Sequence, residues 1–542
     1  MTTSTAVPPA PPAPPTTPTE TSRRPRPESH ARGALTMGYV AKLLLVALVD
    51  ALGVYGIFAG SAHESWGIVG FLAFALLLVN LVYFVPSRRL IPAKYLVPGL
   101  LFLLVYQVFV VMYTGYTAFT NWGDGHNSTQ SDAVTAILSQ NERRVDGSPS
   151  YGLSVVEKGT TLGFAVVAPG KTPQVGTAAS PLTDVPGATV ANGVVTALPG
   201  YSVLDFSSIV QRQQEITNLR VPVSANPNDG SIRTTDGSVG YLYRSTYSYD
   251  AATGILTGPE GTYRADEKVG NFVDAKGQKI EPGWKVAVGF KNFTDVLTDS
   301  SLRGPFVSVL VWTFAFAILS VLLSFGLGLF LAITLNHPRV RGQRLYRSLL
   351  ILPYAMPAFL SAVVWAGMFN QTFGFINTVL LRGASVPWLN DPWLAKGAVL
   401  LVNLWLGFPY MFLVCTGALQ SIPADAIEAA KIDGASGPRI FRSITLPLLL
   451  VSTAPLLISS FAFNFNNFNI IYLLTQGGPR DLTAGVNVGS TDILISFVYK
   501  LAFQGVNRQY GLACAISILI FLIVASISAA TFRRTRALEE LN

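Results

Sequence analysis

Charged residues are scarce in this sequence. Only 13% of its 542 residues are Asp, Glu, Lys or Arg, whereas 50% are hydrophobic, and the mean hydropathy is +0.43. Soluble domains carry about 25% charged residues, so a soluble fold of this length would lack the polar side chains to cover its apolar ones. The scarcity excludes an ordinary multidomain soluble protein and indicates an integral membrane protein.

Cysteine and histidine are also rare. The two cysteines, Cys415 and Cys514, both lie inside apolar stretches, which excludes a disulfide-rich scaffold and a cysteine zinc site. The four histidines are far apart in the sequence, so no metal site is expected. The phosphate-binding pattern G-x-x-x-x-G-K-[ST] does not occur, so the chain is not expected to bind ATP through a P-loop.

Two polar ends flank the apolar part of the chain. Residues 1–35 are rich in Pro, Ala and Thr with several Arg, a composition that buries too little apolar surface to fold. We expect a disordered cytoplasmic tail there, without the apolar core of a cleavable signal peptide. Residues 534–542 are expected to form a second, short cytoplasmic tail.

Long apolar runs fill much of the remaining sequence. A spanning helix needs about 20 mostly apolar residues, and helices are expected because a backbone in lipid must satisfy its own hydrogen bonds. Asp50 is the only acidic residue in the runs that qualify, and we expect it to contact a neighbouring helix or lie near the interface. The eight runs are 37–59, 66–85, 96–119, 305–335, 348–369, 395–419, 448–475 and 510–532.

The distribution of Lys and Arg indicates an orientation. With the N-terminus inside, 17 basic residues fall in the inside segments and five in the short outside loops. Cytoplasmic segments carry the excess of positive charge, so both termini are expected in the cytoplasm. Much of the net charge of +8 then reflects membrane topology rather than nucleic-acid binding.

One outside loop is long enough to fold by itself. Residues 120–304 hold short β-branched and aromatic segments broken by Gly, Asn, Asp and Ser, which predicts a mostly β extracytoplasmic domain. The expected protein is an all-α polytopic membrane protein with this domain inserted between helices three and four. Helices one to three would occupy 36–119, and helices four to eight would form a core in 305–533.

The inside loop at 421–447 has a pattern that a simple connection between two helices does not need. Asp425 is expected to cap a short helix over 426–432, and Gly434 to close it in a left-handed conformation. Pro438 opens a second short helix. Two short helices around a Gly bend would form a rigid protrusion, whose apolar side suits a groove on a soluble partner.

Polar side chains interrupt the seventh apolar run. Asn464 and Asn467 are three residues apart, and Ser460 is one turn before Asn464, so they are expected on one helical face with Phe463 beside them. Amides that bond sugar hydroxyls, with an aromatic ring to cover an apolar sugar face, suit a carbohydrate site. Polar contacts between helices are the alternative, because a buried amide needs a partner.

The sixth run adds three residues of the same character. Gly407 permits a close approach of the backbone, and Tyr410 offers a ring and a hydroxyl. Pro409 is expected to disrupt the helix and free backbone groups, which is tolerated where protein groups or cavity water satisfy them. A proline-kinked packing helix would explain the same pattern.

These segments together resemble a known family. Glu428-Ala429-Ala430 with Asp433-Gly434 looks like the EAA loop, which docks the membrane subunits of ATP-binding-cassette (ABC) importers onto a cytoplasmic ATPase. With the Asn-rich run, the match extends over most of 290–533. The chain thus resembles the larger inner-membrane permease subunits of maltose/maltodextrin ABC importers, which have eight helices and a large domain after the third.

The resemblance implies a site, partners and an energy source. It implies no cofactor on this chain, because ATP and Mg are used by the partner ATPase. The implied partners are a second permease subunit (MalG-like), two copies of an ATPase subunit (MalK-like), an extracytoplasmic maltose-binding protein, maltose or maltodextrin, and membrane lipid. The implied ATPase-coupling residues are Glu428, Ala429, Ala430, Asp433 and Gly434, and the implied sugar-binding residues are Leu406, Gly407, Tyr410, Ser460, Phe463, Asn464 and Asn467.

Other functions stay open on the residues alone. The same machinery could import trehalose or another neutral oligosaccharide, whereas a phosphorylated polyol is disfavoured because the seventh run has no Lys or Arg to pair with it. An ion-coupled secondary carrier has only Asp50 in its favour. A membrane enzyme acting on polysaccharide would need catalytic carboxylates in 120–304, where no recognisable spacing occurs.

Overall fold

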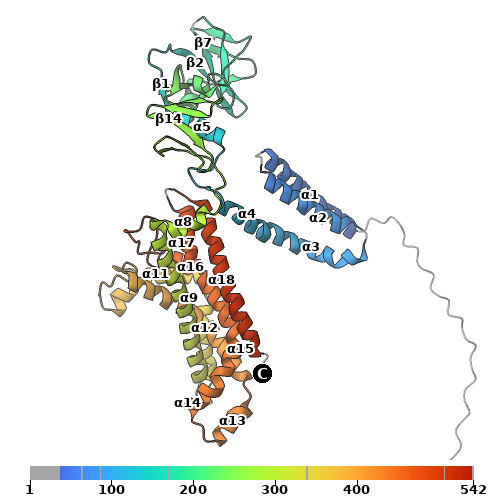
Figure 1. Ribbon diagram of the computed structural model, residues 1–542, viewed down its shortest axis with the longest axis vertical. Coiled ribbons are helices and arrows are strands. Elements are labelled where there is room, and N and C mark those ends of the chain that lie inside the picture. Colours follow the sequence, from blue (N-terminus) through green and yellow to red (C-terminus); the bar gives the residue numbers. More distant parts are fainter. Residues whose placement is uncertain are drawn as a thin grey trace, which may run out of the picture. The chain divides into compact units, whose positions relative to one another are not determined.

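The computed structural model, drawn in Figure 1, describes residues 37–62, 65–85, 87–168, 170–336, 340–505 and 507–539. The predicted tail at 1–35 lies outside these residues. The chain divides into two compact units, with the division in the sequence between Val110 and Val111.

The first unit holds the N-terminal apolar helices. Asp50 accepts a hydrogen bond of 2.8 Å from the Asn80 amide, so α1 and α2 are joined by a polar contact within their apolar surfaces. This is the helix contact expected for Asp50. The helices are α1 (Met37–Ala62), α2 (Trp66–Phe84) and α3 (Ile91–Leu103), which continues through a π-helical turn, η2 (Leu104–Val108), into α4 (Phe109–Ala118) across the unit boundary.

A mostly β domain follows α4, as predicted. In the described part of the chain its strands form an antiparallel nine-stranded sheet with main order β5-β4-β3-β2-β11-β10-β9, a five-stranded sheet β12 to β16 and the pair β6-β7. The strands are β1 (Glu142–Arg144), β2 (Tyr151–Lys158), β3 (Thr161–Val167), β4 (Gln174–Thr177), β5 (Thr183–Asp184), β6 (Thr189–Ala191), β7 (Val194–Ala197), β8 (Ser202–Val203), β9 (Val221–Pro222), β10 (Ser231–Thr234), β11 (Val239–Ser245), β12 (Ser248–Asp250), β13 (Ile255–Gly258), β14 (Gly261–Asp266), β15 (Asn271–Val273) and β16 (Lys279–Ile280).

Each large sheet of this domain has its own apolar core. Ile137 of helix α5 (Gln130–Gln140) packs with Phe272 of the five-stranded sheet and with Trp284, which follows the last strand of that sheet. Phe164 and Ile232 of the nine-stranded sheet pack with Ile216 of α7. The short helices beside the second core are α6 (Phe206–Gln211), α7 (Gln213–Asn218) and η3 (Pro227–Asp229).

The two ends of the domain run side by side where they meet the helical core. The Asn121 N–H donates to the Val286 carbonyl at 3.1 Å, and the Val288 N–H donates to the Phe119 carbonyl at 2.8 Å. The Gly511 N–H at the start of α18 donates to the Trp122 carbonyl at 2.9 Å. The domain is therefore an insertion whose base is fixed to the last long helix.

The helical core agrees with the predicted spans in number. Among the described residues of both units, seven helices are long and apolar enough to cross a membrane, and the number is eight if the bent pair α10 and α11 is counted as one span. The helices of this part are α8 (Lys291–Thr298), α9 (Ser300–Leu335), α10 (Gln343–Ala355), α11 (Ala358–Met368), α12 (Pro392–Ser421), α13 (Ala424–Ile432), α14 (Gly437–Ile440), α15 (Leu446–Phe465), α16 (Phe468–Leu474), α17 (Leu494–Phe503) and α18 (Tyr510–Glu539), with π-helical turns η4 (Ile376–Leu380) and η5 (Phe441–Thr445).

Two of the predicted spans have a different course from the one expected. The fifth run bends by 92° between α10 and α11, because Met356 precedes Pro357 and adopts an extended conformation. The seventh run does not continue to residue 475. Its helix α15 ends at Phe465, and α16 starts a new short helix three residues later.

Helices α9 and α12 pack against each other with almost no space between their backbones. A Cβ atom at Gly328 would lie only 2.7 Å from the carbonyl carbon of Met411 and the backbone nitrogen of Phe412. The expected disruption at Pro409 is wrong, because α12 runs as one helix from Pro392 to Ser421 with Pro409 buried inside it. The helix therefore continues through Pro409 although the proline has no backbone N–H to donate.

Candidate functional site

A cavity of about 600 Å³ lies among α9, α10, α12, α15 and α16. This volume is in the range of small-molecule binding sites, about 300–1,000 Å³. All seven residues predicted from the resemblance line it, although their role as a sugar site stays a prediction. Its lining consists of Ser320, Val321, Ser324, Pro353, Tyr354, Met356, Ala358, Asn403, Leu406, Gly407, Tyr410, Met411, Ser459, Ser460, Phe463, Asn464, Asn467, Asn469 and Ile470.

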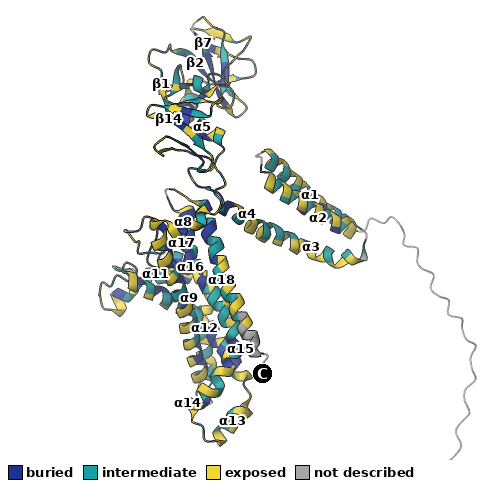
Figure 2. Cartoon of the chain, in the orientation of Figure 1, coloured by how far each residue is buried: buried dark blue, intermediate teal, exposed yellow. Residues whose placement is uncertain are grey.

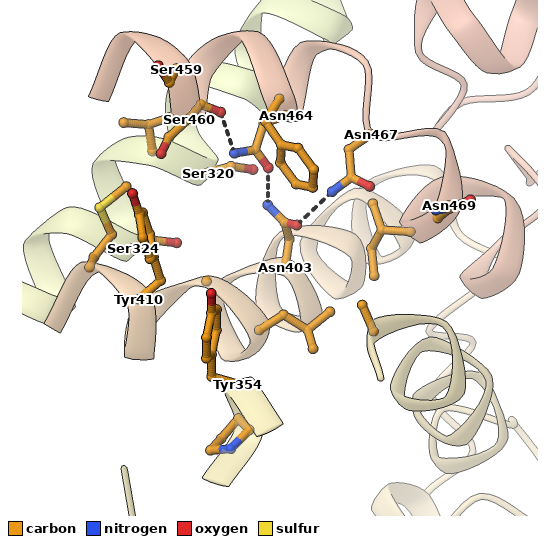
Figure 3. Close-up of a pocket in the computed structure, with 18 of the residues that line it drawn as sticks. Ser320, Ser324, Tyr354, Asn403, Tyr410, Ser459, Ser460, Asn464, Asn467 and Asn469 are labelled. Atoms are coloured by element: carbon orange, nitrogen blue, oxygen red, sulfur yellow. Dashed lines mark hydrogen bonds between the residues drawn. The ribbon is translucent and has the colours of Figure 1, made fainter. Parts of the chain in front are cut away.

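A chain of side-chain amides crosses one wall of the cavity (Figure 3). The Asn403 amide donates to Asn464 Oδ1 at 2.7 Å, and Asn403 Oδ1 accepts from the Asn467 amide at 3.2 Å. The chain ends at the Ser460 carbonyl, which accepts from Asn464 Nδ2 at 2.8 Å. Each amide is thereby fixed in orientation and keeps spare donor or acceptor positions for a polar ligand.

The amide chain depends on a break in the helix that the spacing argument did not predict. Asn466 leaves the α-helical region with φ −113° and ψ 22°, and Asn467 occupies the position just before α16. The expectation that Asn464 and Asn467 share one face of a continuous helix is therefore wrong. Asn403 on α12 brings their side chains together instead.

Aromatic rings supply the apolar part of the lining. Tyr354 of α10 and Tyr410 of α12 stack with ring centroids 6.4 Å apart and an angle of 21° between their planes. The Phe463 side chain is 69% exposed, so its ring face is open to an occupant. No residue of the lining is charged, and the site therefore suits a neutral ligand with many hydroxyls and some apolar surface.

Sequence reasoning missed several of the lining residues. Asn403 carries a usable signal, because it precedes Gly407 by one turn and Tyr410 by two on the same face of α12. Ser320 and Ser324 of α9 repeat at the same spacing, but nothing in an otherwise apolar run relates α9 to the Asn-rich segment. Tyr354 reaches the cavity only because the fifth run bends just after it.

The predicted coupling loop forms an exposed protrusion (Figure 2). Helix α13 has no buried residue, and Glu428, Ala429 and Asp433 are exposed while Ala430 is half-buried. Gly434 adopts φ +78°, the left-handed conformation expected for it. The Ala435 N–H donates to the Ala430 carbonyl at 2.9 Å and closes the turn.

Two details of this loop differ from expectation. Asp425 does not cap α13: Pro423 precedes the helix, and Asp425 lies in its first turn, where a carboxylate favours the helix dipole. The second helix is not separate. It starts at Gly437 and passes through the turn η5 into α15, so the protrusion is directly continuous with a wall of the cavity.

Within the described residues, no group of three or more His, Cys, Asp or Glu side chains is placed to hold a metal ion. Both cysteines are free, Cys415 on α12 and Cys514 on α18. The chemistry available in the cavity is therefore hydrogen bonding and aromatic contact.

Two family models match the chain. One is described as the N-terminal of TM subunit in PBP-dependent ABC transporters and matches residues 101–179. The other is described as binding-protein-dependent transport system inner membrane component and matches residues 324–537, which include most of the cavity and the whole protrusion.

Individual relatives match over nearly the full length. The maltose/maltodextrin transport system permease protein MalF of Vibrio vulnificus (strain YJ016) is 38% identical over 508 residues, covering 90% of this chain and 94% of the relative. MalF of Escherichia coli (strain K12) is 34% identical over 474 residues, covering 84% and 89%. A bacterial ABC transporter involved in the import of the acidic polysaccharide alginate has 22% identity over 46% of this chain and 84% of its own, with a TM-score of 0.40.

Proposed function

Because this chain belongs to the MalF family of ABC-importer permease subunits, we propose that it carries maltose or maltodextrins across the cytoplasmic membrane as the larger permease of an ATP-driven importer. The observation that carries the proposal is the neutral cavity with its fixed amide chain and its exposed aromatic ring. Such a lining offers donors and acceptors to sugar hydroxyls and a flat apolar face to a pyranose ring. ATP hydrolysis belongs to a separate subunit.

Sugar binding in the cavity would divide between two kinds of residue. Tyr410, Asn464 and Asn467 would hydrogen-bond hydroxyls directly, and the Phe463 ring would cover an apolar sugar face. Ser460 fixes Asn464 through its carbonyl, and Leu406 and Gly407 shape the wall of α12. Binding here should be weak, because the sugar must also leave toward the cytoplasm.

Energy would reach the cavity through the exposed loop. Glu428, Ala429, Ala430, Asp433 and Gly434 would contact a MalK-like ATPase, one of two copies, with a MalG-like permease beside this chain. Because the loop continues into α15, a displacement of α13 would move a cavity wall. The cycle requires that ATP binding favour one access state over the other.

The basic residues support an orientation for this machine. Both termini and the loop 421–447 would face the cytoplasm, and 120–304 would face the opposite side of a bacterial inner membrane. The maltose-binding protein would dock there, partly on the β domain. In this organisation 1–35 is a tail, 36–119 holds three helices, 305–533 is the transport core and 534–542 is a tail, whose first six residues continue α18.

The test is reconstitution of the complex in liposomes with the partner permease, the ATPase and the binding protein. The measurement is the ATPase rate with maltose, maltotriose or trehalose. Stimulation by maltose and maltotriose would support the proposal. Stimulation by trehalose alone would keep an importer and reject the maltose assignment, and a verified complex without any stimulation would contradict the proposal.

A further inference from the structure

One hydroxyl in the cavity wall has no partner. Ser320 of α9 is 1% exposed, and its Oγ makes no hydrogen bond within the described protein. Other buried hydroxyls bond to a carbonyl one turn back: Thr313 on α9 itself donates to Val309 at 2.7 Å, and Ser361 on α11 donates to Pro357 at 3.2 Å. Ser320 leaves that option unused.

The position of this hydroxyl points to an occupant of the cavity. The described part of the chain has other buried hydroxyls without a partner, but Ser320 is the one among them that lines the cavity. Figure 3 shows it among the labelled residues that line the cavity. Buried polar groups are nearly always hydrogen-bonded. The Ser320 Oγ is closed to contact in this conformation, so we expect the side chain to turn toward the cavity and bond the group that enters it.

The surrounding wall favours a hydroxylated, neutral partner for Ser320. No lining residue carries a charge, so an anion or cation would find no counter-charge there. Ser324 lies one turn further along α9, and its Oγ is only 2.8 Å from the place of a Cβ at Gly407. The absence of a side chain at Gly407 leaves room for this second hydroxyl, so α9 contributes two serines to the cavity lining.

We propose that Ser320 is a specificity-determining residue of the sugar site, donating a hydrogen bond to one particular hydroxyl of the transported sugar. The inference rests on the proposed function and extends the site to α9, which contributes none of the residues identified from the sequence. A site built to bond a hydroxyl discriminates against an analogue that lacks it, because its own polar group is then left unpaired. Ser320 would thus select one sugar position rather than add general affinity.

The test compares Ser320→Ala with the unaltered protein in the reconstituted complex, using maltose and its monodeoxy analogues. For maltose we expect about a three- to tenfold higher half-saturating sugar concentration, the value of one neutral hydrogen bond. For one deoxy analogue the two proteins should have the same half-saturating concentration, since the partner hydroxyl is already missing. Ser361→Ala is the matched control, a buried serine outside the cavity that should leave the whole series unchanged.

The outcomes separate this inference from the proposed function. No stimulation of the unaltered complex by maltose contradicts the function itself. If maltose stimulates the unaltered complex but Ser320→Ala raises the half-saturating concentration equally for maltose and every analogue, Ser320 has a structural role and the inference is overturned. An unchanged half-saturating concentration for maltose in Ser320→Ala also overturns it. If the alanine variant does not assemble, Ser320→Cys keeps the shape with a weaker donor and must show the same analogue-dependent pattern.

Discussion

Asn403 connects the two other asparagine amides of the cavity wall. It donates to Asn464 and accepts from Asn467, so its side chain sets the orientation of both amides at once. Its own position is fixed because it is largely buried on the long helix α12. The polar chemistry of the site therefore depends on a residue in a different helix from the Asn-rich segment.

We expect Asn403→Ala to raise the half-saturating sugar concentration for transport about tenfold or more, because two hydrogen bonds that orient the site are lost. Sugar uptake and complex assembly would both be measured. Asn466→Ala is the control, since its exposed side chain bonds only the Ala462 carbonyl and does not line the cavity. Normal uptake by the Asn403 variant, or an equal defect in the control, would argue against the amide chain as the sugar site.

Asp492, two residues before α17, and Lys500 on α17 form a buried ion pair. Lys500 Nζ lies 2.7 Å from Asp492 Oδ2, and the carboxylate also accepts from the Gly489 N–H and the Ser496 hydroxyl. Lys500→Met would leave the carboxylate buried without its cation, at a cost of about 3–5 kcal/mol. The thermal stability of the purified protein should fall clearly.

A matched control is available for this pair. Lys291 pairs with Asp295 at the surface, where the lysine side chain is 62% exposed, so Lys291→Met should change the thermal stability little. Replacing both buried partners, as in Asp492→Leu with Lys500→Met, should recover part of the loss. Equal stabilities of the two single variants would show that the buried pair does not contribute as described.

At the scale of single elements, hydropathy predicted where the apolar helices lie in the sequence but not where they bend or break. An apolar run has the same composition whether straight or bent, so the 92° bend after Tyr354 and the end of α15 at Phe465 were not visible in it. The reverse error occurred at Pro409, where α12 continues as one helix. The Gly434 turn was predictable because its residue type determines its backbone conformation.

Gly434 therefore gives the sharpest test of the coupling loop. Proline fixes φ near −65° and cannot adopt the observed +78°, so Gly434→Pro should abolish sugar-stimulated ATPase activity or release the ATPase. Gly437→Ala is the control in the same loop, because φ there is not left-handed and a Cβ would meet no atom within 4 Å. Unchanged stimulation with Gly434→Pro would contradict coupling through this turn.

At the scale of the whole molecule, the β domain is an insertion with adjacent ends. The Gly283 N–H donates to the Gly125 carbonyl at 2.8 Å, so residues 127–281 can be replaced by a short Gly/Ser linker while the base of the domain is kept. We expect this variant to bind the ATPase normally and to bind the sugar-binding protein several-fold more weakly. Both affinities would be measured by co-purification and titration, and unchanged docking would count against the proposed role of the domain.

The fold class was predictable at this scale because it follows from composition and run length. The mostly β character of 120–304 was also predictable from its short strands. Its division into separate sheets depends on long-range pairings such as β2 with β11, which local patterns do not encode. The cavity was predicted in part. The seven residues that the resemblance indicated on α12 and in the Asn-rich segment line the cavity. Asn403 and the residues from α9 and α10 were missed, because their position at the cavity is set by tertiary packing.

The close packing of α9 on α12 has a consequence for how the cavity can open. The backbones are in close contact where Gly328 faces Met411 and Phe412, and sliding one helix along the other would bring a side chain into a space that does not hold even a Cβ atom. A hinge between them would have to break that contact completely. The pair should accordingly behave as a stationary frame during transport, and the walls contributed by α10 and α15 should swing against it.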